Sequence, residues 1–253
     1  MTPFKLIGMR WLNGHTMSLT LQPQQPYPFR AGQYLTLPFS SSPKAMSYSI
    51  ASRSPREKEG KCGDIDAIEI QIGGILPDSE LAVEITHFRA HRLNQEPFLL
   101  GQAAGEAYFR SAGRPISVIA GGSGFSYAKS IVLEALSQPT PPDITLFWGG
   151  KRLSDLYEHE AMIALSQAHP QLHYVPVVEL LSSDDMTNLV EEAGLHQGRL
   201  LDIFFANSEL RAEQDIYICG RYQMVQTAYQ QIQHANPELA KRIYSDALPP
   251  AHG

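Results

Sequence analysis

The sequence predicts two joined domains, an antiparallel β-barrel followed by an α/β domain with a parallel sheet. Up to about residue 75, short runs alternate apolar and polar residues with a period near two. After Gly113, strand-like apolar runs alternate instead with helical segments. The change of period divides the chain into domains of residues 1–112 and 113–253. At 253 residues and 43% hydrophobic content, the chain can build a full core without disulfides or metals.

The first domain is predicted from short strands separated by Pro, Gly, Ser or charged residues. The expected strands are residues 4–9, 16–22, 33–39, 47–52 and 67–74. Segments 23–32 and 52–64 are rich in turn-forming and charged residues, so we expect a loop and a solvated hairpin connection there. Residues 77–94 have helical spacing, with Leu81, Ile85, Phe88 and Leu93 on roughly one face, and should cover one end of the barrel.

The second domain follows a strand–helix alternation. Strands are expected at 115–122, 143–150, 172–180 and 215–221, and helices at 125–138, 154–169 and 222–235, with weaker segments at 188–195 and 198–207. Parallel strands need crossovers of about ten or more residues to return across a sheet face, and these helices supply that length. An open parallel sheet is therefore expected.

Composition excludes several function classes. The net charge of −6 and a pI near 5.8 disfavour nucleic acid as a partner. Cys62 and Cys219 are the only cysteines, so neither a disulfide framework nor a cysteine-ligated iron–sulfur cluster is expected, and we predict no metal site. No stretch approaches the roughly 20 apolar residues that span a bilayer, and the first residues lack a signal-peptide core. We expect a cytoplasmic protein that has no membrane partner.

A glycine-rich turn lies at the first strand–helix junction of the second domain. Gly121, Gly122 and Gly124 would let the backbone approach a ligand, and free amides at a helix start favour a phosphate or diphosphate. The spacing differs from the G-x-G-x-x-G fingerprint and from a P-loop. A tight turn without a ligand is the alternative.

Two further strand ends carry candidate residues. Lys151 and Arg152 follow the second parallel strand, where a carboxylate would select an unphosphorylated nicotinamide cofactor, so cations there would tolerate a 2′-phosphate. Cys219 ends the fourth strand, at the edge where such sheets bind ligands. An exposed basic turn and an inert buried thiol are the respective alternatives.

The segment "MSYSIAS", residues 46–52, ends a strand of the first domain. Ser47 and Ser49 place hydroxyls on one face, and Tyr48 and Ile50 point the other way. A strand with one solvated face explains this pattern by itself. The rest of the chain supports a more specific interpretation.

Several motifs occur together in a fixed order: "RAGQYLTL", "SYSIAS", "GEAYFR", "IAGGSGFSYAKSI", "ITLFWGGKR", "VPVVE" and "DIYICGRYQM". This ordered set resembles the ferredoxin-reductase superfamily and, within it, the bacterial NAD(P)H:flavin reductases, including those of luminous bacteria. The resemblance implies a flavin-binding barrel, a nicotinamide-binding α/β domain, and hydride transfer from NAD(P)H to flavin N5. It implies that FMN, riboflavin or FAD is used, and we expect an exchangeable substrate. Reduced flavin would serve a monooxygenase or reduce ferric chelates.

The resemblance also implies roles for individual residues. Tyr48 would lie beside the flavin and Ser49 near its N5, while Cys219 and Asp246 would lie beside the reacting rings. Ser49, Cys219 and Asp246 are thus the expected catalytic residues. The expected cofactor-binding residues are Met46, Tyr48, Ser49, Gly74, Gly121, Gly122, Ser123, Gly124, Phe125, Ser126, Lys151, Arg152, Cys219, Gly220, Arg221 and Met224.

The chain departs from the family pattern at its flavin motif and its tail. Met46 stands where the motif begins with arginine, and Ser47 stands where proline follows. A thioether cannot make the paired hydrogen bonds that a guanidinium makes with phosphate. Flavin affinity should therefore be low, unless an arginine elsewhere compensates; the candidates are Arg30, Arg53 and Arg110. The tail offers Leu248, Pro249 and Pro250 in place of a final aromatic residue.

Two alternatives remain open from the sequence. One is a reductase component that keeps FAD bound and passes electrons to a protein acceptor. The other is a non-catalytic relative that binds nucleotide without turnover, which the loss of the arginine at position 46 would permit.

Overall fold

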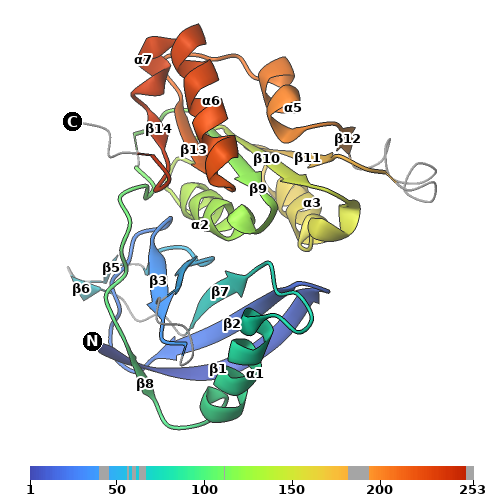
Figure 1. Ribbon diagram of the computed structural model, residues 1–253. Coiled ribbons are helices and arrows are strands. Elements are labelled where there is room, and N and C mark those ends of the chain that lie inside the picture. The colour runs from blue at the N-terminus through green and yellow to red at the C-terminus, as the bar shows by residue number, and fades with distance from the viewer. Residues whose placement is uncertain are drawn as a thin grey trace.

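A computed structural model describes residues 1–39, 46–55, 57–58, 61–62, 67–110, 112–181 and 194–248. The chain forms an all-β half and an α/β half that lie against each other (Figure 1). Most of the weak helical segment predicted at 188–195, as well as Pro249 and Pro250, lies outside the described residues.

The N-terminal half is built from antiparallel strands. One sheet has the order β7-β2-β1-β8, formed by β1 Thr2–Asn13, β2 Thr16–Pro23, β7 Ile68–Ile72 and β8 Phe98–Leu100. A second pair consists of β3 Tyr34–Leu37 and β4 Met46–Ser49, and β5 Glu57–Lys58 pairs with β6 Lys61–Cys62. Bridges between Ile50 and Ile70 and between Tyr34 and Ala104 join the β3–β4 pair to the rest. The sheet thereby curls into a half-barrel, which confirms the predicted antiparallel architecture.

Helix α1, Glu80–Arg92, covers the barrel core with Ile85 and Phe88, as its spacing predicts. It begins later than the expected Pro77, because Asp78 has a left-handed backbone (φ 60°). Ser79 caps the helix instead, its hydroxyl accepting from the amide of Ala82 at 3.2 Å.

The C-terminal half contains a parallel sheet with the strand order β12-β11-β10-β9-β13-β14. Its long strands are β9 Ile116–Gly121, β10 Ile144–Gly150, β11 Leu172–Val178 and β13 Asp215–Cys219. The two edge strands, β12 His196–Gln197 and β14 Ile243–Tyr244, were not predicted. Two residues are too few to produce a periodic pattern.

Helices cover both faces of this sheet (Figure 1). They are α2 Phe125–Leu136, α3 His159–Ala168, α5 Leu200–Asn207, α6 Tyr222–Ala235 and α7 Pro237–Ala240, with short 3₁₀ turns η1 Gly122–Gly124 and η2 Leu153–Asp155. Helices α2 and α3 lie on the face turned toward the barrel, and α5 and α6 lie on the other (Figure 1). Alternate residues of β9 follow this division: Val118 packs in the core with α2, and Ile119 packs in the core with α6. None of the described helices is long and apolar enough to cross a bilayer.

The order of strands creates a switch point beside β9. The chain runs outward from β9 to β10 and β11, and then returns to place β13 on the other side of β9. Cys219, the last residue of β13, pairs with Ala120 of β9. The carboxyl ends of these two strands are therefore neighbours, and this is where open α/β sheets bind ligands.

Candidate active site between the two halves

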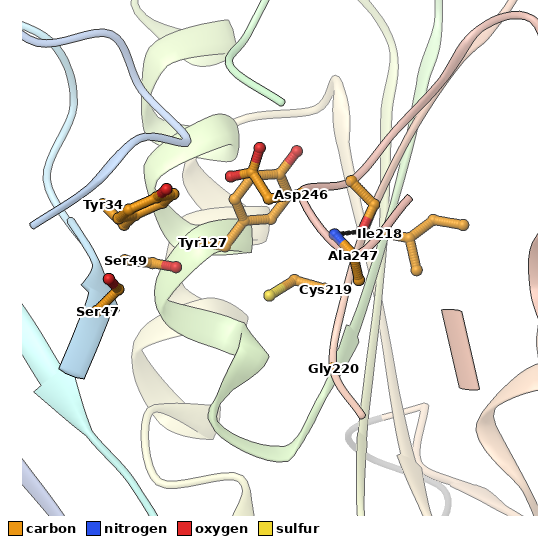
Figure 2. A pocket seen from close by; sticks show the side chains of 10 residues that line it. Tyr34, Ser47, Ser49, Tyr127, Ile218, Cys219, Gly220, Asp246 and Ala247 are labelled. Atoms are coloured by element: carbon orange, nitrogen blue, oxygen red, sulfur yellow. Dashed lines mark hydrogen bonds between the residues drawn. The ribbon is translucent and has the colours of Figure 1, made fainter. Parts of the chain in front are cut away.

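A cavity of about 130 Å³ lies between the barrel and the edge of the parallel sheet. Ser47, Ser49 and Tyr34 line it from the barrel, Tyr127 lines it from α2, and Cys219, Gly220 and Asp246 line it from the sheet side. Figure 2 shows the Ser49 hydroxyl and the Cys219 sulfur pointing toward one another across this space. The structure thus brings together Ser49, Cys219 and Asp246, the residues expected to be catalytic.

Strand β4 divides its residues between two faces. Ser47 and Ser49 line the cavity, whereas the hydroxyl of Tyr48 contacts the sulfur of Met46 at 3.5 Å. Within the described chain, the Ser47 hydroxyl lies 3.1 Å from that of Thr36, while the Ser49 hydroxyl has no side-chain partner. Ser49 is therefore available to a ligand. Met46 and Tyr48 do not line the cavity, and burial raises the pKa of Tyr48 to about 12.

The Cys219 thiol is neutral at physiological pH. Burial raises its pKa to about 12, and the negative charge of Asp246 adds to the shift. A thiol with a raised pKa is a poor nucleophile. Cys219 thus contributes a small, uncharged wall to the cavity, and Gly220 beside it adds no side chain.

Asp246 links the C-terminal segment to the connection between β8 and β9, which joins the two halves of the chain. Its Oδ1 accepts from the backbone amides of Glu106 at 2.9 Å and Ala107 at 3.1 Å. The Tyr127 hydroxyl donates to the carbonyl of Ala107 at 2.6 Å, so this residue is held from two directions. Gly105 has φ 110°, and a Cβ at this position would lie 2.6 Å from Asp246 Oδ2. Only glycine allows the carboxylate to approach this closely.

The loop at the end of β9, with Gly121, Gly122 and Gly124, packs against the loop at the end of β13, which contains Gly220. A Cβ on Gly124 would lie 2.5 Å from the carbonyl oxygen of Cys219, and Cβ atoms on Gly121 and Gly220 would lie 2.9 Å and 2.6 Å from the Met224 side chain. Gly124 is thus required by the packing of one loop on the other, because its close atoms are backbone, whereas the close atoms at Gly121 and Gly220 belong to the flexible end of the Met224 side chain. Gly122 differs, because it has φ +55° and no atom within 4 Å of its Cβ position.

Gly74 likewise combines φ +77° with open space. Its neighbour Gly73 is tightly packed, since a Cβ there would lie 2.4 Å from the Cβ of Ser123. The exposed glycine-loop residue Ser123 therefore rests directly on the barrel. Open space for a ligand remains at Gly74 and Gly122, and the binding of a ligand by the glycine-rich turn stays a prediction.

Two residues of the expected nucleotide loop have side chains that no ligand reaches. Phe125 is fully buried and stacks on Trp148 with ring centroids 3.6 Å apart. Ser126 is 2% exposed and donates to Gln71 Oε1 at 3.1 Å. Their side chains serve packing and the contact between the two halves.

Lys151 and Arg152 lie in the turn after β10, exposed to solvent. Asp155 Oδ2 accepts from both of their backbone amides at 2.9 Å, which fixes the turn. In the described part of the chain, neither cationic side chain has a carboxylate partner. Arg221, the residue before α6, is also exposed. These cations remain available to an anion.

The arginines expected to compensate for Met46 lie elsewhere. Arg30 and Arg110 stack on the ring of Tyr108 at 4.4 Å and 4.3 Å, and they line a second cavity of about 360 Å³. Arg110 also stacks on Tyr244 at 4.4 Å, and Arg53 donates to a backbone carbonyl at 3.4 Å. None of these arginines lines the cavity between Ser49 and Cys219. Compensation for Met46 by one of these arginines stays a prediction.

Sequence reasoning missed several residues that line the cavity: Tyr34, Ser47, Tyr127, Ile218, Ser245 and Ala247. Tyr34 pairs directly with Ser49 across the β3–β4 ladder. The signal that could have found it is strand register, which the sequence alone does not fix here. Among the described residues, no group of three or more His, Cys, Asp or Glu side chains could hold a metal ion.

Comparison with known proteins decides the family. Residues 118–230 match the oxidoreductase NAD-binding domain model. The chain is 32% identical over 235 residues to an NAD(P)H-flavin reductase from Aliivibrio fischeri, covering 92% of each chain. The chain belongs to the NAD(P)H-flavin reductase family. A second member of that name, from Vibrio harveyi, is 30% identical over 96% of both chains. The resemblance drawn from the ordered motifs is confirmed.

Solved structures show that the flavin reductase fold of this chain is that of the ferredoxin reductases. An Amycolatopsis cytochrome P450 reductase superimposes with a TM-score of 0.78 at 20% identity, covering 99% of this chain and 70% of that one. A ferredoxin NADP⁺ reductase from Neisseria gonorrhoeae, with bound FAD and NADP, gives 0.70 at 20% identity and covers 93% of this chain and 91% of its own. These similarities support the two-part fold.

Proposed function

We propose that this protein is an NAD(P)H-dependent flavin reductase that brings the reacting edges of both ring systems together at the cavity between Ser49 and Cys219 and treats flavin as an exchangeable substrate. The observation that carries the proposal is geometric. Ser49 from the barrel and Cys219 from the sheet edge border one cavity, although 170 positions separate them in the chain. The reaction needs two flat rings pressed together, and this is the place where the two halves meet.

The residues at the cavity fit the chemistry that the two ligands supply. When bound, the nicotinamide supplies a hydride from its C4 and the flavin accepts it at N5. Ser49 offers a neutral hydroxyl without another side-chain partner, which can hydrogen-bond to a ring nitrogen without imposing a full charge. The protein's contribution is to position the rings and exclude water.

Cys219 and Asp246 shape the opposite side. The protonated thiol keeps the wall uncharged. Asp246 is held by two backbone amides, so a carboxylate stays fixed beside the thiol. A fixed negative charge near a nicotinamide ring favours the positive charge that the ring gains on losing hydride.

Two features support flavin exchange. The cavity of about 130 Å³ is smaller than the roughly 300–1,000 Å³ of pockets that enclose drug-sized ligands. It can enclose only the reacting edges of the rings, so most of a flavin would remain outside it. Met46 adds no cation that could hold the phosphate of FMN or FAD.

Each half of the chain is expected to bind one of the two ligands. We propose that residues 1–112 hold the flavin and residues 113–253 hold the nicotinamide cofactor. Lys151 and Arg152, free of carboxylate partners in the described structure, support the use of NADPH as well as NADH. We keep a monooxygenase and a ferric chelate as alternative consumers of the reduced flavin. The expected cytoplasmic location stays a prediction.

The test is turnover by flavin-depleted protein. We expect oxidation of NADH or NADPH only when riboflavin or FMN is added, followed as loss of the absorbance of the reduced nicotinamide. Ser49→Ala should lower kcat by about 10²-fold, the size of one removed hydrogen-bond donor at a reacting centre. Turnover without added flavin would favour the bound-FAD reductase, and nucleotide binding without any turnover would favour the non-catalytic relative.

A further inference from the structure

A cluster of polar side chains connects the barrel to the α/β half behind the glycine loop. We name it the polar bridge. It consists of Ser18, Glu69 and Gln71 from the barrel and Ser126, Lys129, Tyr157 and Glu158 from the α/β half. The reaction proposed above does not use these residues directly.

Lys129 is the centre of the bridge. Its ammonium lies 2.7 Å from Glu69 Oε2 of the barrel and 2.8 Å from Glu158 Oε2 beside α3. The three side chains are only 15%, 19% and 10% exposed. Breaking such a shielded ion pair is costly, because it leaves an uncompensated charge out of water. The pairs therefore hold the barrel and the α/β half in one relative position.

Gln71 is the second residue of the bridge that connects the barrel to the α/β half. Its amide nitrogen donates to Glu158 Oε1 at 2.6 Å, and its oxygen accepts from Tyr157 at 2.9 Å and from Ser126 at 3.1 Å. The side chain is 3% exposed. One barrel residue therefore engages the first turn of α2 and the segment before α3 together.

The charges in the bridge support one another. Burial alone would raise the pKa of Glu69, but attraction to Lys129 and hydrogen bonds from Lys129, Ser18 and Gln71 lower it overall. Arg10 lies 3.8 Å from the same carboxylate, at the exposed end of the cluster. Glu69 is thus charged at neutral pH and holds Lys129 in place.

The bridge is connected through the backbone to the glycine loop and to Tyr127, one of the residues that line the cavity. Gly73, two residues after Gln71, packs on Ser123 of the glycine loop, where a Cβ would come within 2.4 Å. Ser126 precedes Tyr127, which lines the cavity. A change in the bridge is therefore passed to the glycine loop through the backbone on both sides of the interface.

We propose that the polar bridge sets the separation of the two cavity walls in the absence of ligands, and that Lys129 is a positioning residue for hydride transfer. This inference rests on the proposed function. A protein that releases flavin cannot rely on a bound prosthetic group to join its halves, so directional bonds must hold the cavity ready. A displacement of about 1 Å at the reacting rings costs up to about 10²-fold in rate.

The test compares Lys129→Met with Lys129→Arg and with Lys241→Met. Lys241 also forms an ion pair, with Glu238, but both side chains of that pair are 69% exposed and neither lines the cavity. We expect Lys129→Met to slow single-turnover flavin reduction at saturating NADPH by about 10-fold or more. It should also weaken the long-wavelength charge-transfer absorbance that reports ring stacking. Lys129→Arg should restore most of both signals, and Lys241→Met should leave them unchanged.

A measurement on the ligand-free protein separates positioning from stability. Hydrogen–deuterium exchange at the backbone amides of 121–126 and 219–220 should accelerate in Lys129→Met and not in Lys241→Met, at temperatures well below unfolding. If Lys129→Met does not fold, the triple variant Lys129→Met, Glu69→Gln, Glu158→Gln removes the uncompensated charges and is tested in its place.

The outcomes distinguish the two proposals. A wild-type protein that does not reduce added flavin would overturn the proposed function and this inference with it. An active wild type whose Lys129→Met variant shows a lower Tm, yet unchanged transfer rate, charge-transfer absorbance and loop exchange, would overturn the bridge alone.

Discussion

Replacing Gly124 with alanine tests whether the packing of the two loops controls catalysis. The new Cβ would lie 2.5 Å from the carbonyl oxygen of Cys219 and 2.7 Å from its carbonyl carbon. Ordinary contact begins at 3.4 Å, so the loops must separate by about 0.9 Å. Both contacted atoms are backbone and cannot rotate away. The backbone of Gly124 itself (φ −57°, ψ −12°) suits alanine, so the conflict is purely one of contact.

The two opposing contributions to stability can be estimated. Alanine stabilises by about 0.4–1 kcal/mol through the unfolded chain, whereas overpacking costs about 1–3 kcal/mol. We expect a net loss of about 1–2 kcal/mol and a fall in Tm of roughly 2–8 °C.

The shift should affect the rate more than the fold. Because Cys219 moves with the carbonyl that Gly124 contacts, the wall of the cavity moves by a comparable distance, and kcat should fall by about 10-fold to 10²-fold. The assay is steady-state NADPH oxidation with added FMN, alongside thermal unfolding. Gly101→Ala is the control, since nothing lies within 4 Å of its Cβ position and its hydrogen bond with Tyr27 uses the backbone carbonyl. A Gly124→Ala protein with wild-type kcat would refute the reasoning.

Three further predictions follow from the site. Met46→Arg should lower the Kd for FMN by roughly 5-fold to 30-fold, since a partly exposed charge-assisted contact is worth about 1–2 kcal/mol. The Kd for riboflavin, which lacks the phosphate, should not change, and a Met46→Leu control should leave both Kd values unchanged. An equal effect of Met46→Arg on both flavins would contradict the reasoning. Because the pKa of Glu69 is lowered by folding, its contribution to stability is present above its ordinary value of 4.5 and is lost as the pH falls through the folded pKa below it. Urea unfolding should therefore show a gap between wild type and Glu69→Gln that closes below pH 4.5, and a gap independent of pH would count against this. In a Cys62→Ser background, iodoacetamide should label Cys219 slowly until the pH approaches 12, where the folded protein begins to form thiolate. Rapid labelling near pH 9, the ordinary pKa of a cysteine thiol, would show that the thiol is not buried as described.

The arrangement of the site could be predicted where a pattern repeats over several residues. The change from alternating to helical spacing separated the two halves, and the strand–helix order implied a parallel sheet with Cys219 at its ligand-binding edge. The ordered motifs then placed Ser49 and Cys219 in one reaction. The structure puts both at one cavity because β13 returns beside β9, and that strand order was not readable from the sequence.

The remaining features depend on contacts between distant residues. The polar bridge joins Gln71 to Ser126 and Tyr157, and each of these looks like an ordinary polar residue in its own segment. The role of Gly124 is similar, because a ligand loop and a tightly packed turn require the same residue type. Only the position of the Cys219 carbonyl distinguishes them. Asp246 was expected beside the rings, but its hydrogen bonds to Glu106 and Ala107 could not be foreseen.

The contacts that hold the two halves together affect how a flavin could enter the cavity. Asp246 holds the connection at Ala107 on one side, and the polar bridge holds the glycine loop on another. Outside the lining of this cavity, Arg110 is stacked between Tyr108 of the connection and Tyr244 of β14, at 4.3 Å and 4.4 Å from their ring centroids. Moving the two halves apart would strain the polar bridge, the hydrogen bonds of Asp246 and the contact between Arg110 and Tyr244 together. If flavin is an exchangeable substrate, as proposed above, we expect it to enter and leave while these contacts are kept, and we expect the lack of a cation at position 46 to favour its release.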